Sequence, residues 1–171
     1  MIKKRLLICC LLAQTILGGF LFTACGSSKE AATPGVFNNP ALQEAITTNE
    51  WLYTANDLQP QSGRSRPVNG IYTVQAIGQK MVVSLPYIGR SFSAAAAYNN
   101  QNPLNFETTN YEITKTQNKK GVWLVTIKPI DYKEVQSMVF MFYDNGTARL
   151  NITLTNRSPI NYNGRFEVKK K

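Results

Sequence analysis

The sequence of 171 residues contains no histidine, and its cysteines, Cys9, Cys10 and Cys25, all lie near the start. Without histidine, a Ser-His-Asp triad, a histidine-ligated zinc site and a histidine general base are all excluded. Aspartate and glutamate together number 10, against 19 lysines and arginines. A carboxylate cage for a metal ion is therefore not expected, and neither is a cofactor or metal of any other kind.

The first 24 residues have the pattern of a bacterial secretory signal. Lys3, Lys4 and Arg5 precede the apolar stretch Leu6–Phe22, and small residues lead up to Cys25. This arrangement is typical of a lipoprotein signal that is cleaved before the cysteine, whose thiol is then acylated. Two alternatives are an uncleaved transmembrane helix, for which the stretch is barely long enough, and an ordinary signal, which would leave Cys25 as a lone free thiol.

We therefore expect three parts in the chain: a signal peptide over 1–24 that is removed, an acylated Cys25 with a flexible tether over 25–38, and a single β-rich domain over 39–171. The small, polar residues after Cys25 would span roughly 20 Å as a flexible coil. Palmitate and a second acyl chain on Cys25 would anchor the protein to the outer membrane. The tether lacks a dense acidic run, which favours the periplasmic face, although exposure at the cell surface stays open.

The charge of the chain is strongly basic, with a formal net charge of +9. A basic exported protein suits anionic partners such as lipid head groups or acidic glycans, although a soluble surface rich in lysine, the alternative that we favour, explains the charge more simply. We expect the membrane as a partner through the lipid anchor. A glycan, an anionic ligand or another envelope protein is a further candidate, and nucleic acid is not expected.

One short helix is predicted over Asn39–Thr48. Asn39 can cap it, Pro40 suits its first position, and its apolar residues fall on one face. Trp51–Ala55 is predicted as the first strand, and the segment from Gln59 to Pro67 as a loop. No helical pattern alternates with the later strands, so a doubly wound α/β fold is excluded.

Three hairpins are predicted from turn residues and alternating apolar residues. The first has a two-residue turn at Gly78-Gln79, and the second has a three-residue loop at 118–120 that aligns Tyr111 and Ile113 with Ile127 and Val125. The third has a type I′ turn at Asn145-Gly146. Its predicted register places Val139, Met141 and Tyr143 beside Ile152, Leu150 and Ala148, and Met138, Phe140 and Phe142 opposite Thr153, Asn151 and Arg149.

The third hairpin contains a strand that is apolar on both faces, so both faces need cover from a helix, a curled sheet or a ligand. A last strand alternates through Ile160, Tyr162 and Phe166. The predicted fold class is mainly β: antiparallel hairpins or a meander of about eight strands, forming a curled sheet, barrel or sandwich with the helix packed on it.

Two stretches, Leu85–Arg90 (LPYIGR) and Arg157–Gly164 (RSPINYNG), carry a resemblance to a known family. They resemble the LPY-x-GR and R-x-x-I-x-Y-x-G patterns of domain-of-unknown-function family 4251, small lipoproteins found mainly in the Bacteroides group. The similarity covers about residues 40–168. It implies a fold and a compartment, and it carries over no activity and no site residues.

The most site-like residues are Tyr87 and Arg90, which offer a flat ring and a bidentate donor on either side of Gly89. A glycan or an anion could bind there. The alternative, which we favour, is a structural corner in which Gly89 allows an unusual backbone angle, the Tyr87 hydroxyl bonds to the backbone and the arginine covers the ring. Arg64 and Arg66 could likewise hold an anion, but a solvated loop explains them more simply.

No residues define a reaction. Asp131, Glu134 and Asp144 are near one another in sequence, but their spacing matches no pair of catalytic carboxylates. We expect a non-catalytic module of the cell envelope that binds a ligand or partner. A structural or assembly subunit of an envelope complex is the alternative, and an enzyme without a recognisable motif is the third.

Overall fold

The structure is a computed structural model that describes residues 36–94 and 101–169. The chain divides into two compact units, Met1–Ala31 and Ala32–Lys171, and the described residues all belong to the second. The predictions for the signal peptide, for acylated Cys25 and for most of the tether lie outside the described residues.

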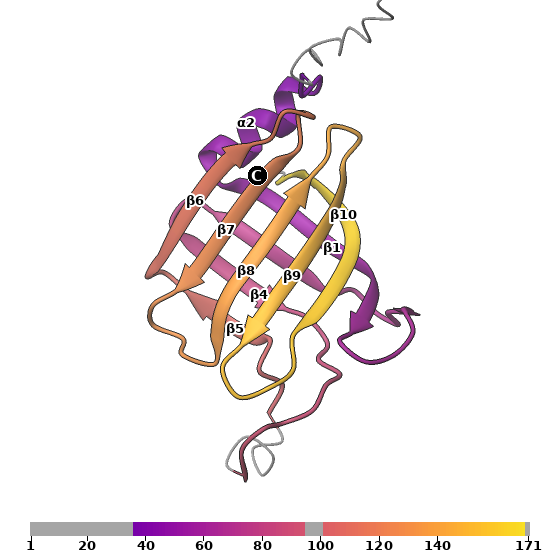
Figure 1. The fold of residues 1–171 in the computed structure, drawn as a ribbon. Helices are drawn as coiled ribbons and strands as arrows, with labels where there is room; N and C mark the ends of the chain where they lie inside the picture. The colour runs from indigo at the N-terminus through magenta and orange to yellow at the C-terminus, as the bar shows by residue number, and fades with distance from the viewer. Residues whose placement is uncertain (1–35, 95–100, 170–171) are drawn as a thin grey trace, which may run out of the picture. The chain divides into compact units, whose positions relative to one another are not determined.

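The described residues of the second unit form the helix α2 and ten strands (Figure 1). They are α2 (Pro40–Thr48), β1 (Glu50–Pro60), β2 (Arg66–Pro67), β3 (Thr73–Ile77), β4 (Lys80–Ser84), β5 (Asn105–Thr108), β6 (Tyr111–Gln117), β7 (Trp123–Pro129), β8 (Val135–Phe142), β9 (Thr147–Leu154) and β10 (Ile160–Val168).

The strands form one antiparallel sheet in the order β5-β4-β3-β1-β10-β9-β8-β7-β6, with the short β2 paired to β1. Figure 1 shows β6 to β9 in front and β1, β4 and β5 crossing behind them, so the sheet curls until it nearly closes into a barrel. The prediction of a mainly antiparallel β fold is confirmed. Among the three architectures that the sequence left open, the nearly closed barrel is the one observed.

Helix α2 begins and faces the core as its sequence predicts. The side chain of Asn39 accepts a hydrogen bond from Leu42 N at 3.1 Å, which satisfies one free amide of the first turn. Its buried residues are Leu42, Ala45 and Ile46. They pack against the core cluster, and the helix contacts β1 and β10.

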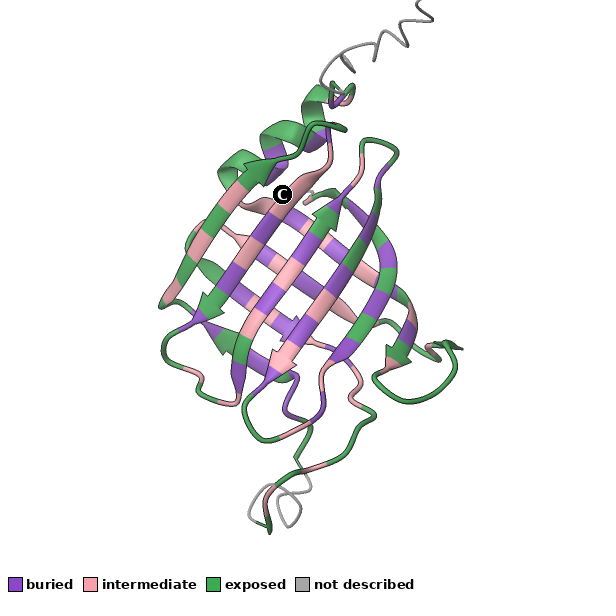
Figure 2. Cartoon of the chain, viewed as in Figure 1, coloured by how far each residue is buried: buried purple, intermediate pink, exposed green. Residues whose placement is uncertain are grey.

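The core fills the inside of the curled sheet, as the alternation of buried and exposed positions along the strands shows (Figure 2). Trp51 and Tyr53 of β1 point inward and meet Phe140 of β8 edge to face, with ring centroids 5.0 and 5.7 Å apart. Tyr162 of β10 is also fully buried. These aromatic rings supply a large share of the buried apolar area that stabilises the fold.

The first predicted hairpin is confirmed. β3 and β4 pair as expected, with Val74 opposite Val83 and Ala76 opposite Met81. Gly78 has φ 59°, which the two-residue turn requires and which glycine adopts without a steric cost.

The second hairpin has a longer loop than predicted. Gln117 pairs with Trp123, and five residues join β6 to β7. The side chain of Asn118 accepts hydrogen bonds from Lys120 N and Val122 N, which stabilises the wider loop. The register moves by two residues from the prediction, and the inward and outward faces are unchanged because side chains alternate with a period of two.

The predicted type I′ turn of the third hairpin is wrong. Gly146 has φ 78°, but Asn145 does not have the positive φ that this turn requires at both central residues. Instead, Tyr143 N donates to Thr147 O at 3.0 Å across a three-residue loop, and the side chain of Asn145 accepts from Thr147 N. A left-handed glycine at the end of such a loop is the usual geometry for three residues.

The predicted register of the third hairpin is therefore wrong by one residue. Phe140 lies opposite Leu150, and Met141 lies opposite Arg149. A slip of one residue exchanges the two faces of a strand. Phe140 consequently packs in the core with Leu150, whereas Met141 and Arg149 lie together on the outer face.

The predicted loop from Gln59 to Pro67 is also partly wrong. β1 continues to Pro60, where it pairs with Ile160 of β10, and Arg66 pairs with Leu58 in the two-residue strand β2. The register of β1 shifts between Ala55 and Asp57, which marks a β-bulge. Bulges bend a strand, and β1 turns sharply downward beyond this point in Figure 1.

Candidate functional site

The two sequence stretches that carry the family resemblance contact each other. The Tyr87 hydroxyl donates to Ser158 O at 2.8 Å, and the Tyr162 hydroxyl donates to Pro86 O at 2.6 Å. Arg90 N donates to Ser158 Oγ at 2.9 Å. We call this set of contacts between Leu85–Arg90 and Arg157–Gly164 the clasp. It ties the segment after β4 to the start of β10.

Tyr87 and Arg90 therefore lie at the structural corner that the sequence favoured, with two differences. The guanidinium over the Tyr87 ring belongs to Arg157, at 5.7 Å from the ring centroid, and not to Arg90. Gly89 is not in the left-handed region. It is glycine because a Cβ there would collide with the Tyr87 hydroxyl and with Ser158 Oγ.

The side chains of Arg64, Arg66 and Arg90 take no part in the clasp contacts. Arg64 lies in the exposed loop after β1, and Arg66 is exposed in β2. Arg90 is exposed beyond β4. No hydrogen bond between described residues joins Arg64 or Arg66 to Tyr87 or Arg90. The sequence offered Tyr87 with Arg90 and Arg64 with Arg66 as separate candidates, and the described hydrogen bonds do not join the two pairs.

Asp131, one of the three carboxylates considered for catalysis, stabilises a chain reversal. Its carboxylate accepts hydrogen bonds from Thr108 Oγ1 and from the backbone amides of Thr109 and Asn110, between β5 and β6. The bond from the Thr108 hydroxyl is the largest cause that lowers the pKa of Asp131, and the two amides add to it. Within the described residues, no three acidic or cysteine side chains gather into a metal-binding group.

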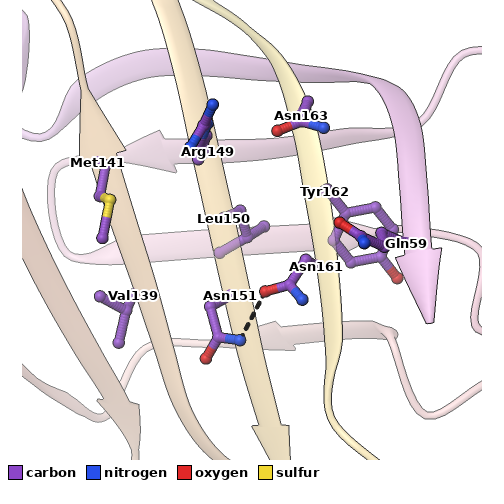
Figure 3. A pocket seen from close by; sticks show the side chains of 9 residues that line it. All are labelled: Gln59, Val139, Met141, Arg149, Leu150, Asn151, Asn161, Tyr162 and Asn163. Carbon is purple, nitrogen blue, oxygen red and sulfur yellow. Dashed lines mark hydrogen bonds between the residues drawn. The ribbon is translucent and has the colours of Figure 1, made fainter. Parts of the chain in front are cut away.

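A hollow of about 350 Å³ lies on the outer face of β8, β9 and β10, beside the bent end of β1 (Figure 3). Its lining residues are Gln59, Val139, Met141, Arg149, Leu150, Asn151, Asn161, Tyr162 and Asn163. Leu150 and Tyr162 are core residues beneath it, and the others belong to the outer face. We call it the amide hollow, because four of its side chains are carboxamides.

Strand register brings these side chains together. Gln59, Asn161, Asn151 and Val139 are successive partners across β1, β10, β9 and β8. Asn151 Nδ2 donates to Asn161 Oδ1 at 2.7 Å, which orients both amides. Directly opposed side chains on one face lie about 5 Å apart at Cβ. The row therefore forms a continuous strip of amide donors and acceptors that ends in an apolar side chain.

The next row adds positive charge. Asn163, Arg149 and Met141 are successive partners across β10, β9 and β8. A second hollow of about 540 Å³ shares Arg149 and Asn163 with the first and extends along the same face. Its other lining residues are Asn56, Tyr143, Thr147, Ala148, Gly164 and Arg165. Asn56 comes from the bulge of β1, which is where that strand bends.

Sequence reasoning did not find the amide hollow. The predicted type I′ turn made Asn151 and Arg149 the partners of Phe140 and Phe142. In that register, the polar residues of the observed outer face lie on one side of the sheet and its apolar residues lie on the other. A three-residue loop at Asp144-Asn145-Gly146 was the signal that would have placed them together.

The described residues contain no helix that is both long and apolar enough to cross a membrane.

The sequence matches the model of a domain of unknown function, DUF4251, over residues 38–166. Among solved structures, it is similar to the crystal structure of a DUF4251 family protein from Bacteroides eggerthii DSM 20697, with a TM-score of 0.53 and 12% identity over 75% of this chain and 86% of that one. No curated protein matches the sequence. At this sequence identity, the similar structure supports the fold alone. Both segments of the clasp lie inside the range that the family model matches. The chain therefore belongs to the DUF4251 family.

Proposed function

We propose that this protein is a non-catalytic binding module of the cell envelope. Acyl chains on Cys25 hold it at the outer membrane, and the amide hollow contacts its ligand. We propose that the β-rich domain lies on the periplasmic side of this membrane. The lipid anchor rests on the sequence pattern that ends at Cys25.

The observation that carries the binding role is the concentration of polar side chains in the amide hollow. Gln59, Asn161 and Asn163 are exposed. Each lies on a strand whose inward-facing residues form the core, so the position of each side chain is fixed by the sheet. Hydrogen bonds to these amides are not needed to hold the sheet, which is paired through its backbone. Polar groups that converge on a recess can fix the orientation of a small ligand and give the site its specificity.

The binding role is tested by isolating the mature, acylated protein from its native membranes and identifying what co-purifies by mass spectrometry. The variant Arg149→Gln/Asn161→Ala removes one guanidinium and one amide from the hollow. The control Arg64→Gln/Gln61→Ala removes the same groups from the exposed loop after β1. We expect a non-lipid molecule with the wild type and the control and its loss with the hollow variant. Equal recovery with all three proteins, or recovery of lipid alone, would contradict the proposal.

The anchor is tested separately on the same material. We expect the mature protein to begin at Cys25 with acyl chains attached, and Cys25→Ser to appear in the soluble fraction. An unmodified N-terminus, or a serine variant that is as firmly bound to the membrane, would contradict the anchor.

An assembly subunit is the second candidate, and the two ends of the sheet favour it. β5 and β6 end the strand order, so each leaves one edge without a strand partner among the described residues. Such edges can pair with a strand of another protein. Chemical cross-linking in native membranes that joins β6 to a second protein would support this function.

A further inference from the structure

We infer that the amide hollow and the hollow beside it bind an acidic saccharide, with Arg149 and Arg165 holding its anionic group. The inference rests on the proposed binding function and adds the chemical class of the ligand. It is carried by the two rows of side chains on the outer face, which combine positive charge, amides and an apolar edge.

The positive charge comes from two arginines that face the same way. Arg149 of β9 pairs with Asn163, and Arg165 of β10 pairs with Thr147 two residues further along, so the arginines are diagonal neighbours on the outer face. Both are exposed, and neither forms an ion pair with a described side chain. Two guanidinium groups at diagonal positions, without an ion-pair partner among the described residues, attract a carboxylate or sulfate, which each can bind with two parallel hydrogen bonds.

Two acidic side chains close to this pair in the strand register form no ion pair with it. Asp57 of β1 is the register partner of Asn163, but it lines neither hollow. Glu167 follows Arg165 on the same outward face of β10 and forms no ion pair with it. An anionic ligand would therefore gain an attraction that these side chains do not already supply.

The amides supply the hydroxyl-binding part of the site. Each carboxamide offers two donors and one acceptor oxygen, which matches sugar hydroxyls that both donate and accept. The bond between Asn151 and Asn161 uses one donor and one acceptor, so the remaining groups of both residues stay available, along with those of Gln59 and Asn163. Amides on adjacent strands, about 5 Å apart at Cβ, can reach different hydroxyls of one sugar ring.

The apolar edge suits the carbon face of a sugar ring. Met141 is 40% exposed, and Val139 lies beside it on the same face of β8. In a water-exposed recess otherwise lined by amides and guanidinium groups, these side chains give the C–H face of a pyranose a surface to cover. A simple anion such as phosphate would leave both the apolar edge and most of the amides without a partner.

The test uses the mature, acylated protein in detergent micelles and a panel of oligosaccharides that carry uronate, sialate or sulfate groups. Each is paired with its neutral counterpart, a methyl ester or the desulfated sugar. Three proteins are compared: the wild type, Arg149→Gln/Arg165→Gln, and the control Arg64→Gln/Arg66→Gln, which removes the same charge from the exposed loop and β2.

We expect at least one acidic oligosaccharide to bind about tenfold more tightly than its neutral counterpart. The neutral sugar lacks the charge-assisted hydrogen bond, and a loss of that size is expected for one such bond. The hollow variant should lose this preference, and the control should keep it. Equal binding of acidic and neutral sugars, no binding of any sugar, or equal losses in the two variants would overturn the inference. A non-lipid ligand that co-purifies through the hollow and is not an acidic sugar would overturn the inference while leaving the proposed function intact.

Discussion

The phenol of Tyr87 donates a hydrogen bond of 2.8 Å to the backbone carbonyl of Ser158, 71 positions later in the chain. The two residues lie in the two separate stretches that identify the family. Since those stretches bind each other, the family patterns describe how the sheet closes at this corner. Asn161, Tyr162 and Asn163 of the amide hollow lie in the second stretch, and its other six lining residues lie outside both stretches.

Removing the Tyr87 hydroxyl should destabilise the fold. Tyr87→Phe deletes the donor and leaves Ser158 O, which is part-buried, without this partner. We expect the free energy of unfolding to fall by about 1 to 2 kcal/mol in urea denaturation. Tyr143→Phe is the matched control, because the Tyr143 hydroxyl forms no hydrogen bond with a described residue. Similar losses in the two variants would contradict a specific role for the clasp.

A methyl group at Gly89 should have a larger effect than its size suggests. The added Cβ of Gly89→Ala would collide with the Tyr87 hydroxyl and Ser158 Oγ, so both groups would have to move. We expect a loss of about 1 to 3 kcal/mol, the usual cost of overpacking. The neighbouring Ile88→Ala, at a side chain that is 44% exposed, should change stability by only about 0.5 kcal/mol. Equal effects in thermal unfolding would count against the close approach at Gly89.

The hydroxyl of Tyr53 should be dispensable for stability. It is buried in the core without a hydrogen-bond partner, which costs free energy relative to its hydration in the unfolded chain. We expect Tyr53→Phe to be as stable as the wild type or more stable by about 1 kcal/mol at neutral pH. A clear loss of stability in urea denaturation would show that the hydroxyl has a partner in solution.

Stability should also fall at alkaline pH. Burial raises the pKa of Tyr53 and of Tyr162 above the ordinary value of 10.0. A raised pKa in the folded state means that the stability is fully present below about pH 10, where the unfolded chain is still protonated, and is lost as the pH rises above it. Phenolate absorbance should show these two tyrosines ionising only as the protein unfolds. Their ionisation in the folded protein near pH 10 would contradict their burial.

Local signals in the sequence predict their own elements well. Asn39 and Pro40 place the start of α2, and Gly78 places the turn between β3 and β4, because in each case the deciding interactions lie within a few residues. The pairing of Tyr87 with Ser158 could not be predicted in this way, since no local pattern specifies a partner 71 residues away.

The amide hollow was missed for a different reason. The Asn145-Gly146 pair suits both a two-residue and a three-residue loop, and the choice between them moves the register by one residue. That single step decides whether Met141 lies beside Leu150 or beside Arg149. An error of two residues, as at the β6–β7 loop, would have left the outer face correctly assigned.

The most direct test of the account separates the clasp from the hollow in one experiment. Tyr87→Phe and Arg149→Gln/Asn161→Ala are produced as mature, acylated proteins. Each is measured for melting temperature and for the ligand recovered from native membranes below that temperature. The account predicts that Tyr87→Phe lowers the melting temperature and keeps the ligand, while the hollow variant keeps the melting temperature and loses the ligand. Loss of the ligand from folded Tyr87→Phe, with full recovery by the hollow variant, would contradict it.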